Sequence, residues 1–312
     1  MSNVWKYIPL NNLTESISYL TDVIKNRSSE TREAIREYPR HEMVCNYIFN
    51  DHAEFSEAKA LAKLMTPMSV LVPWWPYWQR VDEILSTDNT FLIANADEMY
   101  TAGDAVVFIS GSSCIEKEVL TASSTELVIT VPIGTALATA IVCPLIQSIV
   151  SGGFNFSRDS VKINTASATF GSVYVKSSSY QPWPLDSGIP IIDEPSKVSG
   201  SLPENISKAI EVYDGDVGNV TFMEVEKYFR HNQTLRLMPH GYADRRKIRR
   251  FIHWIQGRYQ TFYMNTWAEE TESPVKTLVR SDADRIEIKH HDWNMFTVNI
   301  PCVEVPDVEE SS

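Results

Sequence analysis

Acidic side chains occur in close pairs at two places, and paired carboxylates are the groups that hydrolyse glycosidic bonds. The pairs are Asp97 with Glu98 and Asp282 with Asp284. Glycosidase chemistry needs two carboxylates that face each other across a cleft. Because the chain has 40 acidic residues, such pairs arise by chance, and neither lies in a distinctive sequence frame. Solvated loop carboxylates are the favoured interpretation.

The densest group of potential metal ligands is His290-His291-Asp292. Adjacent residues of a strand point to opposite faces, so this group would chelate one ion only within a turn. The stretch from Ser110 to Cys114 lacks the GxSxG spacing of a nucleophile elbow. No stretch resembles a phosphate-binding loop. We therefore expect no enzymatic activity, no metal and no cofactor.

An aromatic segment from Val70 to Trp78 contains Trp74, Trp75 and Trp78. Its prolines hold the backbone extended and exclude a helix. Two interpretations stay open. The segment is either a lid over the core or a contact between subunits, because Trp and Tyr are enriched at interfaces.

A basic cluster spans Arg245 to Arg250 in a predicted helix. Nucleic-acid binding has weak support, because the whole chain carries a formal net charge of -12. We favour a solvated helix face, or a face that pairs with an acidic patch on a neighbouring subunit. The segment that follows, Arg258 to Trp267, is predicted to be an aromatic strand. Its part from Tyr259 to Trp267 and the segment from Val70 to Trp78 are the predicted buried joints between subunits.

These segments supply the candidate contact residues of an assembly interface. They are Trp74, Trp75, Trp78, Arg245, Arg246, Arg249, Arg258, Tyr259, Phe262 and Trp267.

Composition fits a globular protein, because 43% of the 312 residues are hydrophobic and 22% are charged. No apolar run approaches the roughly 18 to 20 residues that span a bilayer, and no signal peptide is evident. The four cysteines form no CxxC pair, which predicts reduced thiols. We expect no membrane partner, no sequence-specific nucleic acid, and synthesis in a bacterial cytoplasm.

Hydrophobic periodicity predicts a β-rich α+β chain. Residues 14–38 are expected to be partly helical, with Thr14 as N-cap, and residues 43–49 form a strand. Ala53 to Met65 is a predicted amphipathic helix. Short strands at regular spacing in residues 85–149 predict an inserted antiparallel β sandwich or barrel-like region.

The C-terminal part has its own predicted elements. Residues 222–237 give one or two strands, and a helix runs from Asp244, its predicted N-cap, to about Gln256, with Gly257 as C′ residue. A strand pair, residues 285–289 and 295–300, closes the chain.

The order of strand, helix and aromatic strand occurs twice. Arg40-His41 precedes the first set and Arg230-His231 the second. This recurrence suggests a duplicated module, which predicts two related ring-type modules in one chain. Their bounds are residues 1–84, with 150–176 completing the sheet, and residues 208–312. Residues 177–207 form a Ser- and Pro-rich crossover. Six chains would present twelve modules, and three chains would present a pseudo-sixfold ring.

Several loose motifs resemble the distal-tail (tail-tip) proteins of tailed bacteriophages and gene transfer agents. They are Leu13 to Asp22, Glu30 to Arg36 with its Glu-x-Arg, Pro39-Arg40, Val72 to Trp74, Pro190 to Ile192, and Gln256 to Trp267, in which Gly-Arg follows a helix and precedes an aromatic strand. Together they cover most of the chain.

The resemblance implies a β-rich module with a packed helix that forms a ring between tail tube and tip. The expected function is therefore that of a non-catalytic virion protein. Its partners would be further copies of itself (a hexameric or trimeric ring), the tail tube protein, and hub or baseplate proteins. The alternative is a carbohydrate- or receptor-binding tail module, which exposed Trp and Tyr in the β region of residues 91–170 would favour.

Overall fold

The computed structural model divides the chain into two compact units. Unit 1 comprises residues 1–15 and 40–178, and unit 2 comprises residues 16–39 and 179–312. The structure describes residues 4–10, 12–25, 30–65, 69–158, 163–172, 175, 183–192, 205–207, 210–214, 220–224, 230–265, 276–292 and 295–305. Residues 16–39, which the sequence assigned to the N-terminal module, belong to unit 2.

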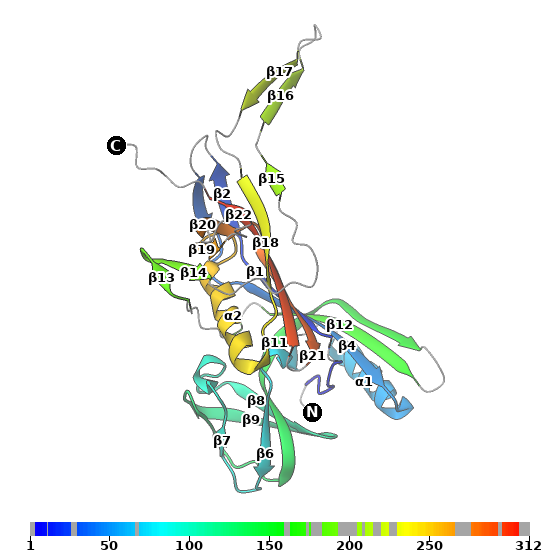
Figure 1. The fold of residues 1–312 in the computed structure, drawn as a ribbon. Helices are drawn as coiled ribbons and strands as arrows, with labels where there is room; N and C mark the ends of the chain where they lie inside the picture. Colours follow the sequence, from blue (N-terminus) through cyan, green and yellow to red (C-terminus); the bar gives the residue numbers. More distant parts are fainter. Residues whose placement is uncertain are drawn as a thin grey trace. The chain divides into compact units, whose positions relative to one another are not determined.

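Strand β1 (Thr14–Ser18) spans the boundary between the units. The other elements of unit 1 are β4 (Arg40–Phe49), α1 (His52–Met65), β5 (Val70–Pro73), the 3-10 helix η1 (Trp75–Tyr77), β6 (Gln79–Ile84), β7 (Thr90–Leu92), the 3-10 helix η2 (Ala96–Glu98), β8 (Ala105–Ser110), β9 (Ser113–Ala122), β10 (Glu126–Ile129), β11 (Leu137–Arg158) and β12 (Asn164–Ser172) (Figure 1).

Unit 2 contains β2 (Thr21–Lys25), β3 (Glu30–Ala34), β13 (Leu185–Asp186), β14 (Ile189–Ile192), β15 (Asn205–Ser207), β16 (Ile210–Asp214), β17 (Val220–Glu224), β18 (Arg230–Leu237), α2 (Gly241–Ile255), β19 (Thr261–Asn265), β20 (Lys276–Ser281), β21 (Arg285–Asp292) and β22 (Met295–Glu304). The predicted β-rich α+β class is confirmed. Neither α-helix is long and apolar enough to cross a membrane within the described residues.

The predicted helix within residues 14–38 is wrong, because β1, β2 and β3 occupy this stretch. Its apolar positions Ile17, Val23 and Ile24 are β-branched, and such side chains lose rotamer freedom in a helix and pack well in strands. The predicted strand at residues 43–49 and the helix from Ala53 to Met65 are both confirmed.

The main sheet of unit 1 has the strand order β4-β12-β11-β5, with every neighbouring pair antiparallel. Val4 adds a parallel bridge to Leu71 of β5, and the backbone N–H of Trp5 donates to the Leu71 carbonyl at 2.9 Å. Helix α1 packs on this sheet through Phe55, whose ring lies 5.6 Å from that of Phe49.

The inserted β region shares strand β11 with this sheet. The first half of β11 pairs with β6 and β8, and β9, β10 and β7 follow in order, all antiparallel. Its own core includes Phe91 and Phe108, whose rings lie 4.7 Å apart. The predicted antiparallel strands of residues 85–149 are therefore confirmed, and they continue the sheet of unit 1.

The main sheet of unit 2 has the strand order β18-β22-β20-β19, again with every neighbouring pair antiparallel. Strand β14 pairs in parallel with β19 at the edge of this sheet. The chain order of the elements is the same in both units. Each has a first strand (β4 or β18), a helix (α1 or α2) and a second strand that pairs in parallel with an earlier segment (β5 or β19). Two further strands then fill the centre of the sheet, β11 and β12 in unit 1 and β20 and β22 in unit 2. The strand orders of the two sheets therefore agree, and the division into two related ring-type modules stays a prediction.

Two hairpins of the same length also occur in the chain. The ribbon β2–β3 pairs from Thr21↔Ala34 to Lys25↔Glu30, and roughly 190 residues later β16–β17 repeats the same five-residue pairing from Ile210↔Glu224 to Asp214↔Val220. Each is a separate two-stranded sheet (Figure 1).

Helix α2 begins at Gly241, three residues before the expected start. The backbone at its N-cap residue, His240, is extended, so the prediction of Asp244 as N-cap is wrong. Asp244 lies in the first turn, where its carboxylate accepts a hydrogen bond from the backbone N–H of His240 at 3.3 Å. The helix ends in the left-handed conformation at Gln256, and Gly257 follows with φ +68°. This conformation explains the glycine.

The stability of the protein should depend on pH through the buried side chain of His41. Burial lowers the pKa of His41 to about 3, so the folded protein holds this ring neutral. The unfolded chain protonates it near pH 6.5, and stability from this residue is therefore full above about 6.5 and lost as the pH falls toward 3. The free energy of unfolding should fall by about 1.4 kcal/mol per pH unit in this window through His41.

Urea titrations between pH 5 and 7 measure this slope. The variant His41→Phe should lose this part of the slope, because phenylalanine does not titrate. The control His52→Asn removes an exposed histidine and should keep the slope of the parent protein. An unchanged slope in His41→Phe would contradict the prediction.

Candidate assembly surface

A buried ion pair fixes the hairpin β2–β3 within unit 2. Arg280 of β20 donates from Nε to Oε1 of Glu30 at 2.6 Å and from Nη2 to Oε2 at 3.2 Å. The two side chains are 2% and 1% exposed. Nη1 of Arg280 also donates to the Ser281 carbonyl at 2.9 Å and to the Asp282 carboxylate at 3.2 Å. Such two-pronged pairing fixes orientation as well as distance.

A second set of bonds joins the hairpin to the turn after α2. Arg32 donates from Nη1 to the Tyr259 carbonyl at 2.8 Å. The carboxylate of Asp284 accepts from the backbone N–H of Thr21 and from that of Arg258, each at 3.2 Å. A Cβ at Gly257 would lie 2.6 Å from Asp284 Oδ1 and 3.1 Å from Asp284 Cα, and the backbone there has φ +68°, so both the space and the conformation favour glycine. The Glu-x-Arg and Gly-Arg motifs of the sequence therefore meet in one site.

The outer side of the hairpin presents apolar groups to solvent. Ile24 is 55% exposed, and Ile35 and Tyr38, which follow β3, are each 59% exposed. Asp22 and Glu33, directly opposite each other, are exposed as well. A rigidly held ribbon with exposed apolar side chains is typical of a protein contact surface.

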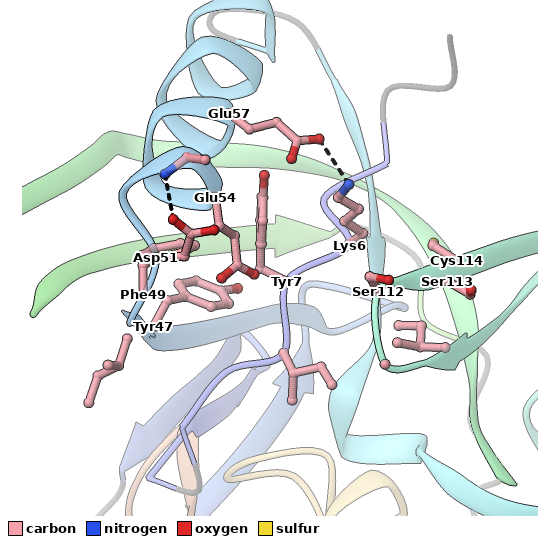
Figure 2. Close-up of a pocket in the computed structure, with 15 residues that line it drawn as sticks. Lys6, Tyr7, Tyr47, Phe49, Asp51, Glu54, Glu57, Ser112, Ser113 and Cys114 are labelled. Atoms are coloured by element: carbon pink, nitrogen blue, oxygen red, sulfur yellow. Dashed lines mark hydrogen bonds and ion pairs between the residues drawn. The ribbon is translucent and has the colours of Figure 1, made fainter. Parts of the chain in front are cut away.

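A polar cavity of 630 Å³ lies in unit 1 between the N-terminal segment, the start of α1 and the β8–β9 turn (Figure 2). Lys6 Nζ lies 2.9 Å from a Glu57 carboxylate oxygen. Figure 2 shows Tyr7 beside this pair and Glu54. Burial, together with Glu57 and Glu54, raises the pKa of Tyr7, and burial raises the pKa of the Cys114 thiol. Both groups stay protonated near neutral pH, so neither is an activated nucleophile.

The acidic and histidine groups that the sequence singled out do not form one site. Asp97 and Glu98 lie in η2. Asp282 and Asp284 belong to the surface of unit 2 that holds β2–β3, which we call the hairpin seat and which comprises Arg258, Tyr259, Arg280, Asp282 and Asp284. His290 is buried, whereas exposed His291 contacts the Thr297 hydroxyl at 2.8 Å. Within the described ranges, no three His, Cys, Asp or Glu residues come close enough together to hold a metal ion.

Trp74 and Trp75 of the segment from Val70 to Trp78 lie in the hydrophobic core, as the first of the two interpretations predicted. Trp74 and Trp75 are fully buried in unit 1, so their side chains have no surface for another subunit. The ring of Trp74 lies 6.3 Å from that of His41. Trp78 is partly buried and packs against the same core, and its proposed contact role stays a prediction.

The basic cluster of α2 does not form the solvated face that the sequence favoured. Arg245 and Arg249 are each only 4% exposed, whereas Arg246 is partly exposed. The Arg245 guanidinium lies 5.0 Å from the ring centres of Tyr242 and Phe296, and such cation–π contacts compensate part of its lost hydration. Burial lowers the pKa of Arg249 to about 9.

The second aromatic segment is divided between core and hairpin seat. Phe262 is fully buried, with its ring 5.2 Å from that of Phe251, so it makes no surface contact. Arg258 and Tyr259 are partly exposed and belong to the seat of β2–β3. Trp267 lies outside the described residues.

The glycan-binding alternative depended on exposed aromatic side chains in residues 91–170. This stretch contains no tryptophan, and Tyr100, its one tyrosine, is 1% exposed. The described residues of this stretch therefore offer no exposed Trp or Tyr, the feature on which the alternative depended.

Comparison of the sequence with known proteins gives no further assignment: no protein-family model matches the chain, and no curated protein matches it.

A sequence signal for the hairpin duplication exists beyond Arg40-His41 and Arg230-His231. Leu13-Thr-Glu-Ser-Ile-Ser18 and Leu202-Pro-Glu-Asn-Ile-Ser207 share four of six positions, and each stretch precedes a hairpin. The sequence prediction of two modules did not use this match.

Removal of one member of the buried pair should destabilise the protein strongly. Glu30→Gln removes the buried counter-ion of Arg280 and leaves only the half-exposed carboxylate of Asp282 beside it, at an expected cost of about 3 kcal/mol. The double variant Glu30→Leu/Arg280→Met removes both charges and should recover most of this loss. Urea unfolding of each variant measures the change.

The control is Lys276→Met, which breaks the exposed pair with Asp186, whose side chains are 47% and 45% exposed. It should cost far less than Glu30→Gln, because solvent screens an exposed pair. Equal losses in Glu30→Gln and Lys276→Met would contradict the assignment of Glu30–Arg280 as the anchor of the hairpin.

Proposed function

We propose that the protein is a non-catalytic structural subunit of a tailed-phage virion, a distal-tail protein that assembles into a ring joining the tail tube to the tip or baseplate. Its partners are further copies of itself, the tail tube protein, and hub or baseplate proteins. Assembly takes place in the host bacterial cytoplasm.

The main support is the duplicated sheet-and-helix unit. Both units have the same order of antiparallel strands with a helix between the first two strands. A repeated unit within one chain supports ring building, because head-to-tail contacts between equivalent surfaces close into a ring when the rotation fits. Three chains would supply six units and six chains would supply twelve.

The exposed face of β2–β3 supports the same proposal. Ile24 lies on a ribbon that buried bonds hold in place, and Ile35 and Tyr38 follow its second strand. Two-stranded ribbons have little stability alone, so ordering this ribbon in advance reduces the entropy lost on assembly.

The purified chain of 35.4 kDa should therefore give a particle mass of three or six copies by mass photometry, and rings by negative-stain microscopy. Ile24→Asp and Ile35→Asp should shift the distribution toward smaller species. Leu92→Asp, which alters a side chain of unit 1 that is 78% exposed, is the control and should not. A chain that stays monomeric, alone and with tail tube and baseplate proteins, would refute the proposal.

A further inference from the structure

Of the two hairpins, β2–β3 and β16–β17, only the first has a known binding surface on a sheet in the part of the chain that the structure describes. The ribbon β2–β3 sits on the sheet of unit 2, where Glu30 meets Arg280. Its repeat, β16–β17, pairs with no other strand of the described residues. If the two units are equivalent, a binding surface for β16–β17 would lie on unit 1. The register of the strands identifies which residue of unit 1 corresponds to Arg280.

In unit 2, the register runs from the first strand of the module to the seat. Strand β18 begins with Arg230, and Asn232, its third residue, lies opposite Val303 of β22. Val303 in turn lies opposite Arg280 of β20. Arg280 is therefore two strands away from the third residue of the module's first strand.

In unit 1, the same path leads to Ile149. Strand β4 begins with Arg40, and Glu42, its third residue, lies opposite Gly171 of β12. Gly171 in turn lies opposite Ile149 of β11. Ile149 therefore occupies in unit 1 the position of Arg280 in unit 2.

The two equivalent positions differ in exposure. Arg280 is 1% exposed beneath β3, whereas Ile149 is 61% exposed. A groove of 460 Å³ adjoins Ile149, with Ser69, Gln147 and Gly171 among its lining residues. Ile149 is thus an exposed apolar residue beside a groove of unit 1, and β16–β17 is a hairpin that pairs with no other strand of the described residues.

We propose that the hairpin β16–β17 of a second copy of this chain docks on the unit 1 groove beside Ile149, as β2–β3 docks on unit 2. The docking site deepens the proposed function, because it assigns the contact through which the ring forms. Each chain then has one seat filled by its own hairpin and one seat filled by its neighbour.

The residue types at the matched positions support this occupant. Val220 begins β17 and has the register position that Glu30 has at the start of β3. The ion pair Glu30–Arg280 is thus replaced by Val220 and Ile149, two β-branched apolar residues. Apolar Val220 of the hairpin thus corresponds to apolar Ile149 of unit 1, as acidic Glu30 corresponds to basic Arg280 in unit 2.

The contact is head-to-tail, since a hairpin from one copy meets a groove on another. Contacts of this kind continue around a ring until it closes, whereas a contact of a patch with itself would stop at a dimer. The same geometry thus accounts for a ring of repeated units.

A charge exchange tests the docking in the full-length protein. Ile149→Arg and Val220→Glu should each weaken assembly about tenfold or more, because each places a charge against an apolar group. The double variant Ile149→Arg/Val220→Glu should restore assembly, because it reproduces the pair of unit 2. Mass photometry over a dilution series measures each association.

Two controls separate folding from docking. Ile149 is exposed, so the thermal melting of Ile149→Arg should match that of the parent chain. Val131→Arg alters a side chain of unit 1 that is 53% exposed and lies outside the groove. It should leave assembly unchanged.

Cysteines at positions 149 and 220 give a second readout. Oxidation of Ile149→Cys/Val220→Cys should link chains to one another on a non-reducing gel. Rings that survive both single charge substitutions, or that yield no link between chains, would overturn the docking and leave the proposed ring function standing. A parent chain that forms no ring would overturn the proposed function itself.

Discussion

The buried pair between Glu30 and Arg280 is the interaction on which the hairpin β2–β3 depends. Taking two charges out of water costs several kcal/mol per ion, and only close geometry with further hydrogen bonds offsets that cost. Arg280 meets this condition, because both oxygens of Glu30, the Ser281 carbonyl and the Asp282 carboxylate accept its donors. A two-stranded ribbon has little stability alone, so the position of β2–β3 follows from this seat.

The pair also shows how a long-range contact can organise a repeated fold. Glu30 and Arg280 are 250 positions apart in the sequence. Arg32, Thr21 and Asp284 add bonds that hold the same ribbon on the turn after α2. Unit 2 therefore contains a segment that the repeat order would assign to the first module. The chain crosses over between its two modules through this ribbon.

Local signals were sufficient to predict part of this fold. The apolar spacing of Phe55, Ala58 and Met65 predicts α1, and Gly257 marks the end of α2. The recurrence of strand, helix and aromatic strand after Arg40-His41 and Arg230-His231 predicted two related modules, and the matching strand orders of the two sheets agree with it.

Other features depend on tertiary packing that a local pattern does not contain. The apolar spacing of Ile17, Leu20 and Ile24 fits a helix, yet their segment pairs as strands. Trp74 and Trp75 were equally consistent with core and surface, and only the packing in unit 1 places them in the core. The partner of Glu30 was not predictable from its neighbours, since many arginines in the chain could pair with it equally well.

The chemistry of the two seats determines which hairpin each one accepts in the proposed ring. Glu30 placed against Ile149 would bury a carboxylate beside an alkyl group. Val220 placed against Arg280 would leave the buried guanidinium with only the half-exposed carboxylate of Asp282 as counter-ion. Each error would cost about 3–5 kcal/mol. Specificity then comes from the penalty on the wrong pairing as much as from the right one. Each β2–β3 hairpin would therefore bind unit 2 of its own chain, and each β16–β17 hairpin would bind unit 1 of a neighbour. The two hairpins would not exchange their binding surfaces around the ring.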